Sequence, residues 1–285
     1  MNNKKALFQL NIGLIFLSTS GVLGRYITVD SILTTLLRAG LAALILVGFC
    51  IWAKSSFEIK ERRDVMLIFI SGVLLGAHWV TYFFALDYSN VAIALLSLYT
   101  FAAVTAIIEP IFFKTAFNKL DIALSLMVFI GVLIMAPSFD INNNYTQAII
   151  FGLLSSLFYA LRNIAISIPA KKYNGSILMV YQLVAMCVIM ILFIGFYDFT
   201  GVMVQLPWIV LLALLTTAIG HTMFVKSLND LNATTASLLS CIVPVYGIIW
   251  AYLFLSEIPS GKTLLGGFMI LSSVVFKTLQ TSKKK

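Results

Sequence analysis

The sequence predicts an all-α integral membrane protein with ten transmembrane helices, arranged as two inverted five-helix repeats around a central cavity. Three features of the sequence predict this fold. First, 61% of the residues are hydrophobic and only 11% are charged, whereas soluble domains carry about 25% charged residues. Second, apolar runs near the ~20 residues that cross a hydrocarbon core recur along the chain. Third, two pairs of apolar helices, half a chain apart, share one layout.

Ten apolar runs account for most of the 285 residues. They predict helices over residues 6–24, 31–53, 64–86, 91–113, 119–136, 147–168, 177–197, 206–228, 233–255 and 261–281. Runs such as Leu41–Val47 do not alternate in polarity, which excludes the strands of a membrane β-barrel. The first run reaches full spanning length without a small-residue cleavage site, so we expect a membrane helix there and not a signal peptide.

Lysine and arginine are distributed so that both termini are predicted to lie in the cytoplasm, because basic residues in short loops are retained on that side. In the ten-helix arrangement, only Arg25 and Lys262 fall on the side opposite to the termini. The net charge of +8 is thus explained by topology and not by a nucleic-acid surface. We expect a multi-pass protein of the cell (inner) membrane.

Two polar breaks half a chain apart are each flanked by apolar helices. Asp87–Asn90 follows the third predicted helix, and Asn229–Asn232 follows the eighth. Each half then holds five spans, an odd number, so the second half enters the membrane upside down relative to the first. Inverted repeats are the construction of alternating-access transporters. We place the repeats at residues 1–139 and 140–285, on either side of a polar turn that begins at Asp140.

Charged side chains inside the predicted helices are candidate coupling or gate residues, because a charge at the bilayer centre costs about 2.5–3.5 kcal/mol. They are Arg38, Glu109 and Arg162. Glu109 and Arg162 both fall in the cytoplasmic third of their helices and are predicted to meet. Three roles are open: the pair acts as an inner gate, Glu109 couples transport to protons, or the pair only stabilises the bundle. Pro244 is predicted to kink the ninth helix, as a hinge or as a rigid bend.

Polar and aromatic side chains in mid-helix are candidate substrate-binding residues. His78 and Tyr82 share one helix face by their spacing, and His221 lies at a comparable depth in the eighth helix. The two histidines could relay protons or bind a substrate, or each could be a neutral histidine bonded to a neighbouring helix. No metal or other cofactor is expected, because no cysteine or carboxylate stands at ligand spacing from either histidine. The full candidate set is His78, Trp79, Tyr82, Tyr99, Tyr159, Asn163, Gln182, His221 and Tyr246.

Several aromatic residues with few fixed charges favour a neutral or zwitterionic, amino-acid-like metabolite as the solute. A secondary transporter is the predicted function, and a passive facilitator or a non-transporting membrane subunit are the alternatives. An enzyme is not expected, because the sequence contains no Gly-x-Ser-x-Gly or His-Glu-x-x-His motif. The expected partners are a small-molecule solute and the lipid bilayer, with protons as a candidate coupling ion.

Short motifs occur in a fixed order along the ten predicted helices: Leu37-Arg38-Ala39, Ile130–Leu133, Ala233–Ser240, Pro244, Leu255-Ser256-Glu257 and Gly266-Gly267. In this order they resemble the EamA-like branch of the drug/metabolite transporter superfamily, over nearly the whole chain. Ala102 stands at the position paired with Pro244, so no fourth-helix proline hinge is carried over. The resemblance implies ten helices as two inverted repeats around a central cavity, and efflux of small metabolites.

Overall fold

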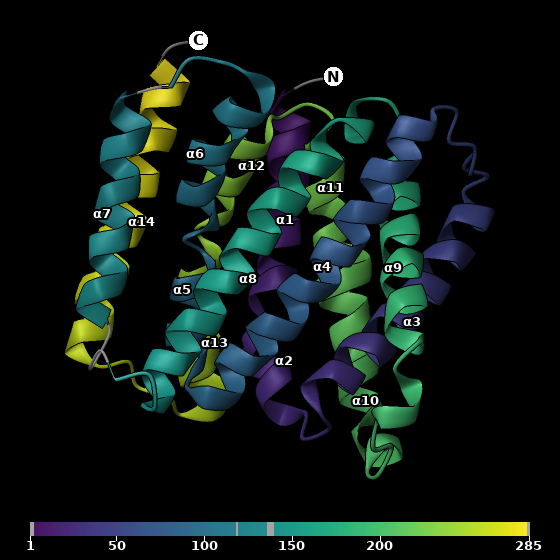
Figure 1. The fold of residues 1–285 in the computed structure, drawn as a ribbon, viewed down its shortest axis with the longest axis horizontal. Helices are drawn as coiled ribbons and strands as arrows, with labels where there is room; N and C mark the ends of the chain where they lie inside the picture. Colours follow the sequence, from purple (N-terminus) through teal and green to yellow (C-terminus); the bar gives the residue numbers. More distant parts are fainter. Residues whose placement is uncertain (1–2, 118, 136–139, 284–285) are drawn as a thin grey trace.

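A computed structural model describes residues 3–117, 119–135 and 140–283 of the chain, which fold into a bundle of helices that lie side by side (Figure 1). The helices are α1 Asn3–Ser18, α2 Ser20–Tyr26, α3 Ser31–Trp52, α4 Arg62–Tyr88, α5 Val91–Leu98, α6 Phe101–Phe113, α7 Lys119–Met135, α8 Asn144–Ser167, α9 Gly175–Ile191, α10 Val202–Leu212, α11 Thr222–Ser227, α12 Ala233–Ser240, α13 Val243–Leu255 and α14 Gly261–Lys283. Two 3-10 turns, η1 Pro169–Lys171 and η2 Ile194–Phe196, and a π-helix, η3 Ala213–His221, connect or extend them.

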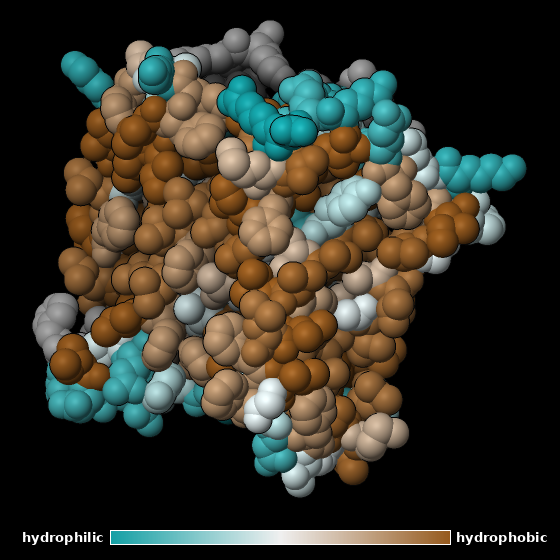
Figure 2. All heavy atoms as spheres, turned by 45° about the vertical axis from the view of Figure 1, so that its right-hand side comes forward, coloured by the Kyte–Doolittle hydropathy of each residue, from teal (hydrophilic) through white to brown (hydrophobic). Residues whose placement is uncertain are grey.

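The ten predicted spans are confirmed, and several consist of more than one helical segment. Seven stretches of the described chain are long and apolar enough to cross a membrane, and Ile122–Met135 and Gly175–Ile191 are shorter apolar helices. α14 supplies the last span. Hydrophobic side chains cover the middle of the molecule, and hydrophilic ones gather at its upper and lower edges (Figure 2).

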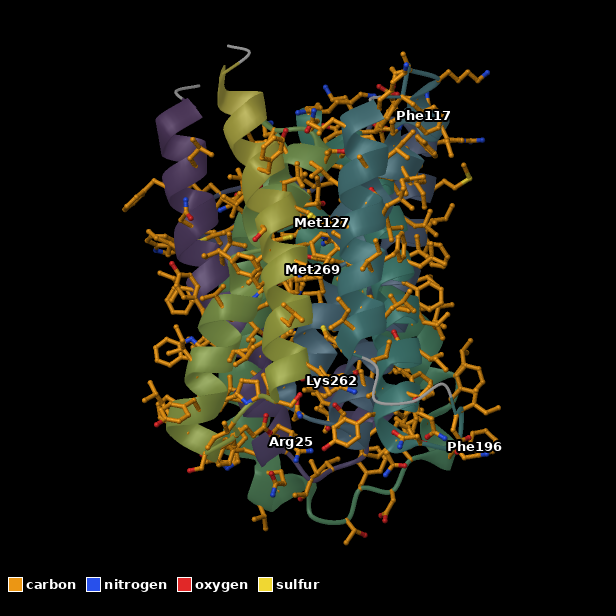
Figure 3. The ribbon with its side chains drawn as sticks, turned by 90° about the vertical axis from the view of Figure 1, so that its left-hand side faces the viewer. Arg25, Phe117, Met127, Phe196, Lys262 and Met269 are labelled. Atoms are coloured by element: carbon orange, nitrogen blue, oxygen red, sulfur yellow. The ribbon has the colours of Figure 1, made fainter. Side chains whose placement is uncertain are left out.

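The first helix begins and the last helix ends at the same end of the bundle (Figure 1). We call this end the terminal face and the other the opposite face. Figure 3 shows Arg25 and Lys262 together at the opposite face, with Phe117 at the terminal face. The two faces therefore match the charge asymmetry of the sequence, and the assignment of the terminal face to the cytoplasm stays a prediction.

The two halves repeat in secondary structure with one constant offset. α5 and α6 correspond to α12 and α13, and each of the four boundaries lies 142 residues after its counterpart, as 91 and 233 do. The matched segments begin alike, because the side chains of Asn90 and Asn232 both accept a backbone N–H bond as N-caps. The helix geometry is therefore duplicated far better than the residue identities. The predicted boundary between residues 139 and 140 touches residues 136–139, which lie outside the described residues.

Helix packing follows the same inverted symmetry. α4 of the first half packs against α8 of the second, and α1 packs against η3 and α11 in the matching position. α7 packs against its own counterpart α14, where a Cβ added at Gly131 would lie 2.8 Å from the carbonyl oxygen of Gly266. Met127 and Met269 mark this helix pair in Figure 3. Small residues allow this close approach of the two backbones.

The ninth span breaks just before Pro244 and not at it. α12 ends at Ser240, α13 begins at Val243, and Pro244 stands in the first turn of α13, where its missing N–H costs nothing. The fourth span breaks at the matching position, between Leu98 and Phe101, without a proline. The break thus belongs to the repeat geometry and does not need the proline, and a hinge role of Pro244 stays a prediction.

Candidate functional site

Aromatic and polar side chains meet at the centre of the bundle, and we call His78, Trp79, Tyr82, Tyr159 and His221 the central cluster. All five are buried, and they come from α4, α8 and η3. The rings of His78 and Tyr159 stack with centroids 4.3 Å apart, and the His221 ring lies 5.9 Å from that of Tyr159. The structure therefore brings five of the nine predicted substrate-binding residues into mutual contact.

Trp79 and His221 mark the pseudo-twofold axis of the repeats. Trp79 Nε1 donates a hydrogen bond to His221 Nε2 at 3.2 Å, and the two residues are 142 positions apart. Equivalent residues can touch only close to the axis that relates them, so the cluster lies at the symmetry centre of the fold. Because Nε2 accepts this bond, the proton of the neutral imidazole is on Nδ1, which has no hydrogen-bond partner among the described residues.

His78 is also tied to a neighbouring helix. Ser155 Oγ donates to the carbonyl oxygen of His78 at 2.8 Å, so the same hydroxyl accepts from His78 Nδ1 at 2.7 Å. Both histidines thus make the inter-helix bonds that the sequence left open as one alternative. Their role in proton relay or solute binding stays a prediction.

Arg38 from α3 packs directly on the central cluster. Its guanidinium carbon lies 3.8 Å from the ring centre of Trp79, a cation–π contact. Nε and Nη2 each donate a 2.7 Å hydrogen bond, to the hydroxyls of Thr217 and Thr216. Arg38 is buried, and it contacts the cluster instead of the bulk solvent.

Arg162 lies on another side of the cluster, with its guanidinium carbon 5.8 Å from the ring centre of Tyr159. Nε donates to Gln182 Oε1 at 2.7 Å and Nη1 donates to Asn163 Oδ1 at 3.0 Å, while Nη2 lies 3.7 Å from Met179 Sδ. The predicted solute ligands Gln182 and Asn163 therefore position this guanidinium. The Nδ2 atom of Asn163 has no hydrogen-bond partner in the described part of the chain.

The predicted ion pair between Glu109 and Arg162 is not formed. Glu109 instead accepts bonds from the backbone N–H groups of Ala233 at 3.2 Å and Thr234 at 3.0 Å, and from the Thr234 hydroxyl. The first N–H groups of α12 have no partner within their own helix, so they attract this carboxylate. Counting residues along each helix gave the depth of Glu109 and Arg162 but not the direction in which each side chain points.

The remaining predicted site residues lie outside the cluster. Tyr99 is buried at the break of the fourth span, where its ring lies edge-on to Phe101. Tyr246 is half-buried on α13, and no described ring contact joins it to the cluster. The sequence reading missed Thr216 and Thr217, although two adjacent threonines in an apolar span were a visible signal.

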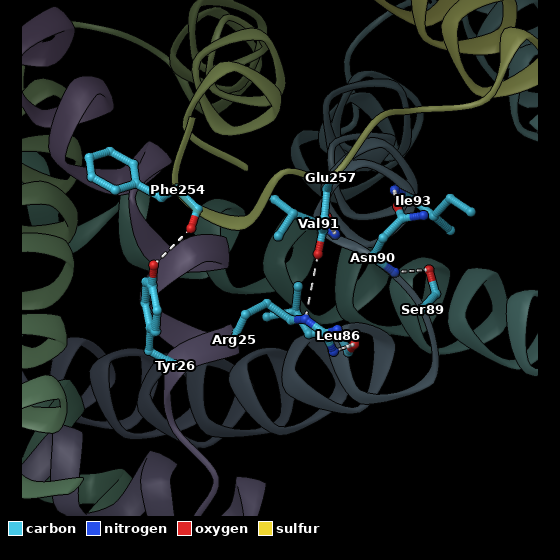
Figure 4. A network of polar contacts seen from close by, with 9 residues as sticks. All are labelled: Arg25, Tyr26, Leu86, Ser89, Asn90, Val91, Ile93, Phe254 and Glu257. Atoms are coloured by element: carbon cyan, nitrogen blue, oxygen red, sulfur yellow. Dashed lines mark hydrogen bonds and ion pairs between the residues drawn. The ribbon is translucent and has the colours of Figure 1, made fainter. Parts of the chain in front are cut away.

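A polar network joins the two repeats at the opposite face (Figure 4). Arg25 Nε lies 3.6 Å from Glu257 Oε1, and Arg25 Nη1 donates to the carbonyl oxygen of Leu86 at 3.2 Å. Glu257 Oε2 accepts from the backbone N–H of Val91, the first residue of α5, at 2.9 Å. We call Arg25, Leu86, Val91 and Glu257 the opposite-face network.

A similar arrangement lies at the terminal face, built from residues that are not repeat partners, because the 142-residue offset pairs Glu109 with Ala251 and Glu257 with Thr115. Glu109 caps α12 as Glu257 caps α5, and Lys171 Nζ donates to the carbonyl oxygens of Asn229 and Leu231 at 3.0 Å each. Here, however, Lys171 and Glu109 form no ion pair and both line a cavity of about 710 Å³. Burial lowers the pKa of Lys171, while Asp230 and Glu109 act to raise it. At each face a carboxylate thus caps the first segment of a broken span, and only Glu257 of the two has an ion pair within the described chain.

Comparisons with known proteins agree with this architecture. The model of the EamA-like transporter family matches twice, at residues 4–136 and 146–279. The pseudopaline exporter CntI of Pseudomonas aeruginosa is 25% identical over 79% of this chain and 78% of its own length. An uncharacterized transporter of Synechocystis is 24% identical over 86% of this chain and 75% of its own.

One solved crystal structure of a protein has a TM-score of 0.75 and 16% identity, and it covers 99% of both chains. This likeness supports the fold alone. The family model covers both halves, and the curated relatives are transporters and not enzymes. On this evidence the chain is a multi-pass membrane protein that belongs to the EamA-like transporter family.

Proposed function

We propose that this protein exports a small metabolite across the inner membrane by alternating access between its inverted repeats, with the terminal face in the cytoplasm. The observation that carries the proposal is a difference between the two carboxylates that cap α5 and α12. Glu257 forms an ion pair with Arg25 at the opposite face, whereas Glu109 and Lys171 form none and line one pocket at the terminal face, where Lys172 pairs with Glu61 and Asp64 instead. Alternating access requires two such ends that open in turn.

A different pair of charged residues is in contact in each closed state. When the terminal face closes, Lys171 moves toward Glu109, as Arg25 now meets Glu257 at the opposite face. The coupling role predicted for Glu109 acts through this contact and through its bonds to α12. Arg162 is too deep in the bundle for this exchange, because its donors are already bound to Gln182 and Asn163.

Export of a small, amino-acid-like metabolite is the direction and solute class that we propose. The relative CntI is a pseudopaline exporter, which supports outward movement of a small metabolite. The aromatic rings of the central cluster support a solute with an apolar body, and the bonded histidines offer fixed hydrogen-bonding groups.

Paired cysteines test the alternating closure. In a variant without Cys50, Cys187 and Cys241, we place one pair at Arg25 and Glu257 and a second pair at Glu109 and Lys171. Solute should raise cross-linking of one pair while it lowers that of the other. If both pairs respond in the same direction, or neither responds to any solute that the protein transports, alternating access is refuted.

Proteoliposomes loaded with labelled solutes, with and without a pH gradient, test transport and its coupling. A passive facilitator equilibrates the solute at one rate in both conditions, whereas a proton-coupled exporter accumulates it only with the gradient. Glu109→Gln should then flatten the pH profile of transport. An unchanged rate and pH profile would remove Glu109 from the coupling step.

A further inference from the structure

We propose that the solute is recognised through a carboxylate group held by Arg38 and Arg162, and that organic anions, with more carboxylates than cationic groups, are the preferred class. This inference rests on the proposed transport function and narrows its small metabolite to one with a net negative charge. It starts from the two guanidiniums that border the central cluster from different sides.

Both guanidiniums are buried, and neither has a carboxylate partner among the described residues. Their hydrogen-bond acceptors are neutral: two threonine hydroxyls for Arg38, and the amide oxygens of Gln182 and Asn163 for Arg162. Ion pairs within the described chain join only other residues, at or near the two faces. Arginine stays protonated in proteins, and charges inside a membrane ordinarily pair with one another. The described centre of the bundle therefore holds two positive charges that nothing there neutralises.

Two hydrogen-bond donors beside the guanidiniums have no partner among the described residues. Asn163 uses its oxygen for Arg162, and its Nδ2 has no described partner. His221 uses Nε2 as an acceptor from Trp79, and its Nδ1–H is likewise unpaired within the described chain. Buried donors of this kind are costly unless an acceptor meets them. A carboxylate supplies acceptors only, with about four lone-pair sites on two oxygens.

The aromatic residues fit the remainder of such a solute. Trp79 and Tyr159 each lie against one guanidinium and also contact His221. They can flank an apolar or planar carbon skeleton while the guanidinium forks hold its acidic end. An amino acid satisfies the carboxylate part, but its ammonium group meets no described carboxylate at the centre. Solutes with two or three carboxylates should therefore bind more tightly than zwitterions of the same size.

Binding to the purified full-length protein in lipid nanodiscs tests this assignment. The probes are C2–C6 mono-, di- and tricarboxylates, each beside its neutral amide, for example succinate beside succinamide, together with glutamate, glutamine and inorganic phosphate. We expect at least one carboxylate to bind ten-fold or more tightly than its amide, and glutamate more tightly than glutamine. If the amides bind equally well, if phosphate alone binds, or if no carboxylate binds, the inference is overturned.

Variants locate the site within the protein. Arg38→Gln and Arg162→Gln should each weaken carboxylate binding ten-fold or more, and Arg162→Lys, which keeps the charge but not the fork, should fall between. Thr105→Ala is the matched control, because Thr105 is buried in α6 and bonds only within its own helix. Equal binding by both Arg→Gln variants and the control would overturn the assignment. The comparison of carboxylate with amide in the unaltered protein does not depend on any variant folding.

The same preparations separate this inference from the proposed function. If a neutral solute is transported, or if the two cysteine pairs still respond in opposite directions while no carboxylate binds, the carboxylate site fails and alternating access stands. If carboxylates bind but the cysteine pairs do not alternate, the site stands and the proposed transport mechanism fails.

Discussion

Replacement of Glu257 by Gln should shift this protein toward a state that is open at the opposite face. The change removes the negative charge that lies 3.6 Å from Arg25 and that accepts the N–H of Val91. The side chains of Arg25 and Glu257 are 39% and 20% exposed, so the ion pair is worth only about 0.5 kcal/mol. Glutamine also offers the backbone N–H of Val91 a neutral acceptor in place of the charged carboxylate, which weakens this hydrogen bond by about 1 kcal/mol. The sum of about 1.5 kcal/mol changes an equilibrium about ten-fold.

A reporter cysteine at Ser20 measures this equilibrium. Ser20 is buried, and its hydroxyl lies 3.4 Å from that of Tyr82 in the central cluster. A membrane-impermeant maleimide, added at the opposite face of oriented vesicles, can reach it only when that face opens. In a background without native cysteines, Glu257→Gln should raise the labelling rate about ten-fold.

Arg25→Gln supplies the second arm of a double-mutant cycle. Because Arg25 and Glu257 act on each other, the double variant should label only slightly faster than Glu257→Gln alone. A labelling rate that Glu257→Gln leaves unchanged would refute the view that this network holds the opposite face closed. Fully additive effects would show that Arg25 and Glu257 act separately.

Three further predictions concern stability and helix geometry. Gly266→Ala should lower the free energy of unfolding in SDS by about 1–3 kcal/mol, because the added Cβ would meet the backbone of Gly131. Gly48→Ala is the control and should have no such effect, since no heavy atom lies within 4 Å of its added Cβ. Equal unfolding midpoints for the two variants would contradict the close α7–α14 contact. Pro244→Ala should leave the break of the ninth span in place, because the fourth span breaks without a proline. The transport rate should therefore change less than about two-fold. A loss of rate of about ten-fold would instead favour a hinge role for Pro244. Hydrogen bonds from Lys172 to the carboxylates of Glu61 and Asp64 raise the pKa of Lys172 above its ordinary value of 10.5. The stabilisation is fully present below pH 10.5 and is lost as the pH rises through the pKa of the folded protein. Lys172→Met should therefore reduce the loss of thermal stability in alkaline solution, and an unchanged dependence of thermal stability on alkaline pH would contradict this prediction.

The inverted-repeat fold could be predicted from the sequence because it depends on local, one-dimensional properties. Apolar run length determines the spans, and the odd number of spans in each half requires inversion. The residue types of the central cluster were likewise visible, since His78, Trp79 and His221 are polar or aromatic residues at mid-helix depth. Depth along a helix is a property of sequence position alone.

Only the tertiary structure decided which partner each side chain has. Glu109 and Arg162 were predicted to meet, yet the carboxylate caps α12 and the guanidinium binds Gln182 and Asn163. The physical reason is that the direction of a side chain around its helix, and the neighbour it meets there, depend on how the helices cross. The sequence by itself determined ten spans, their inversion and a polar centre, whereas the packing of the helices decided that two arginines in that centre would have no acidic partner within the described chain.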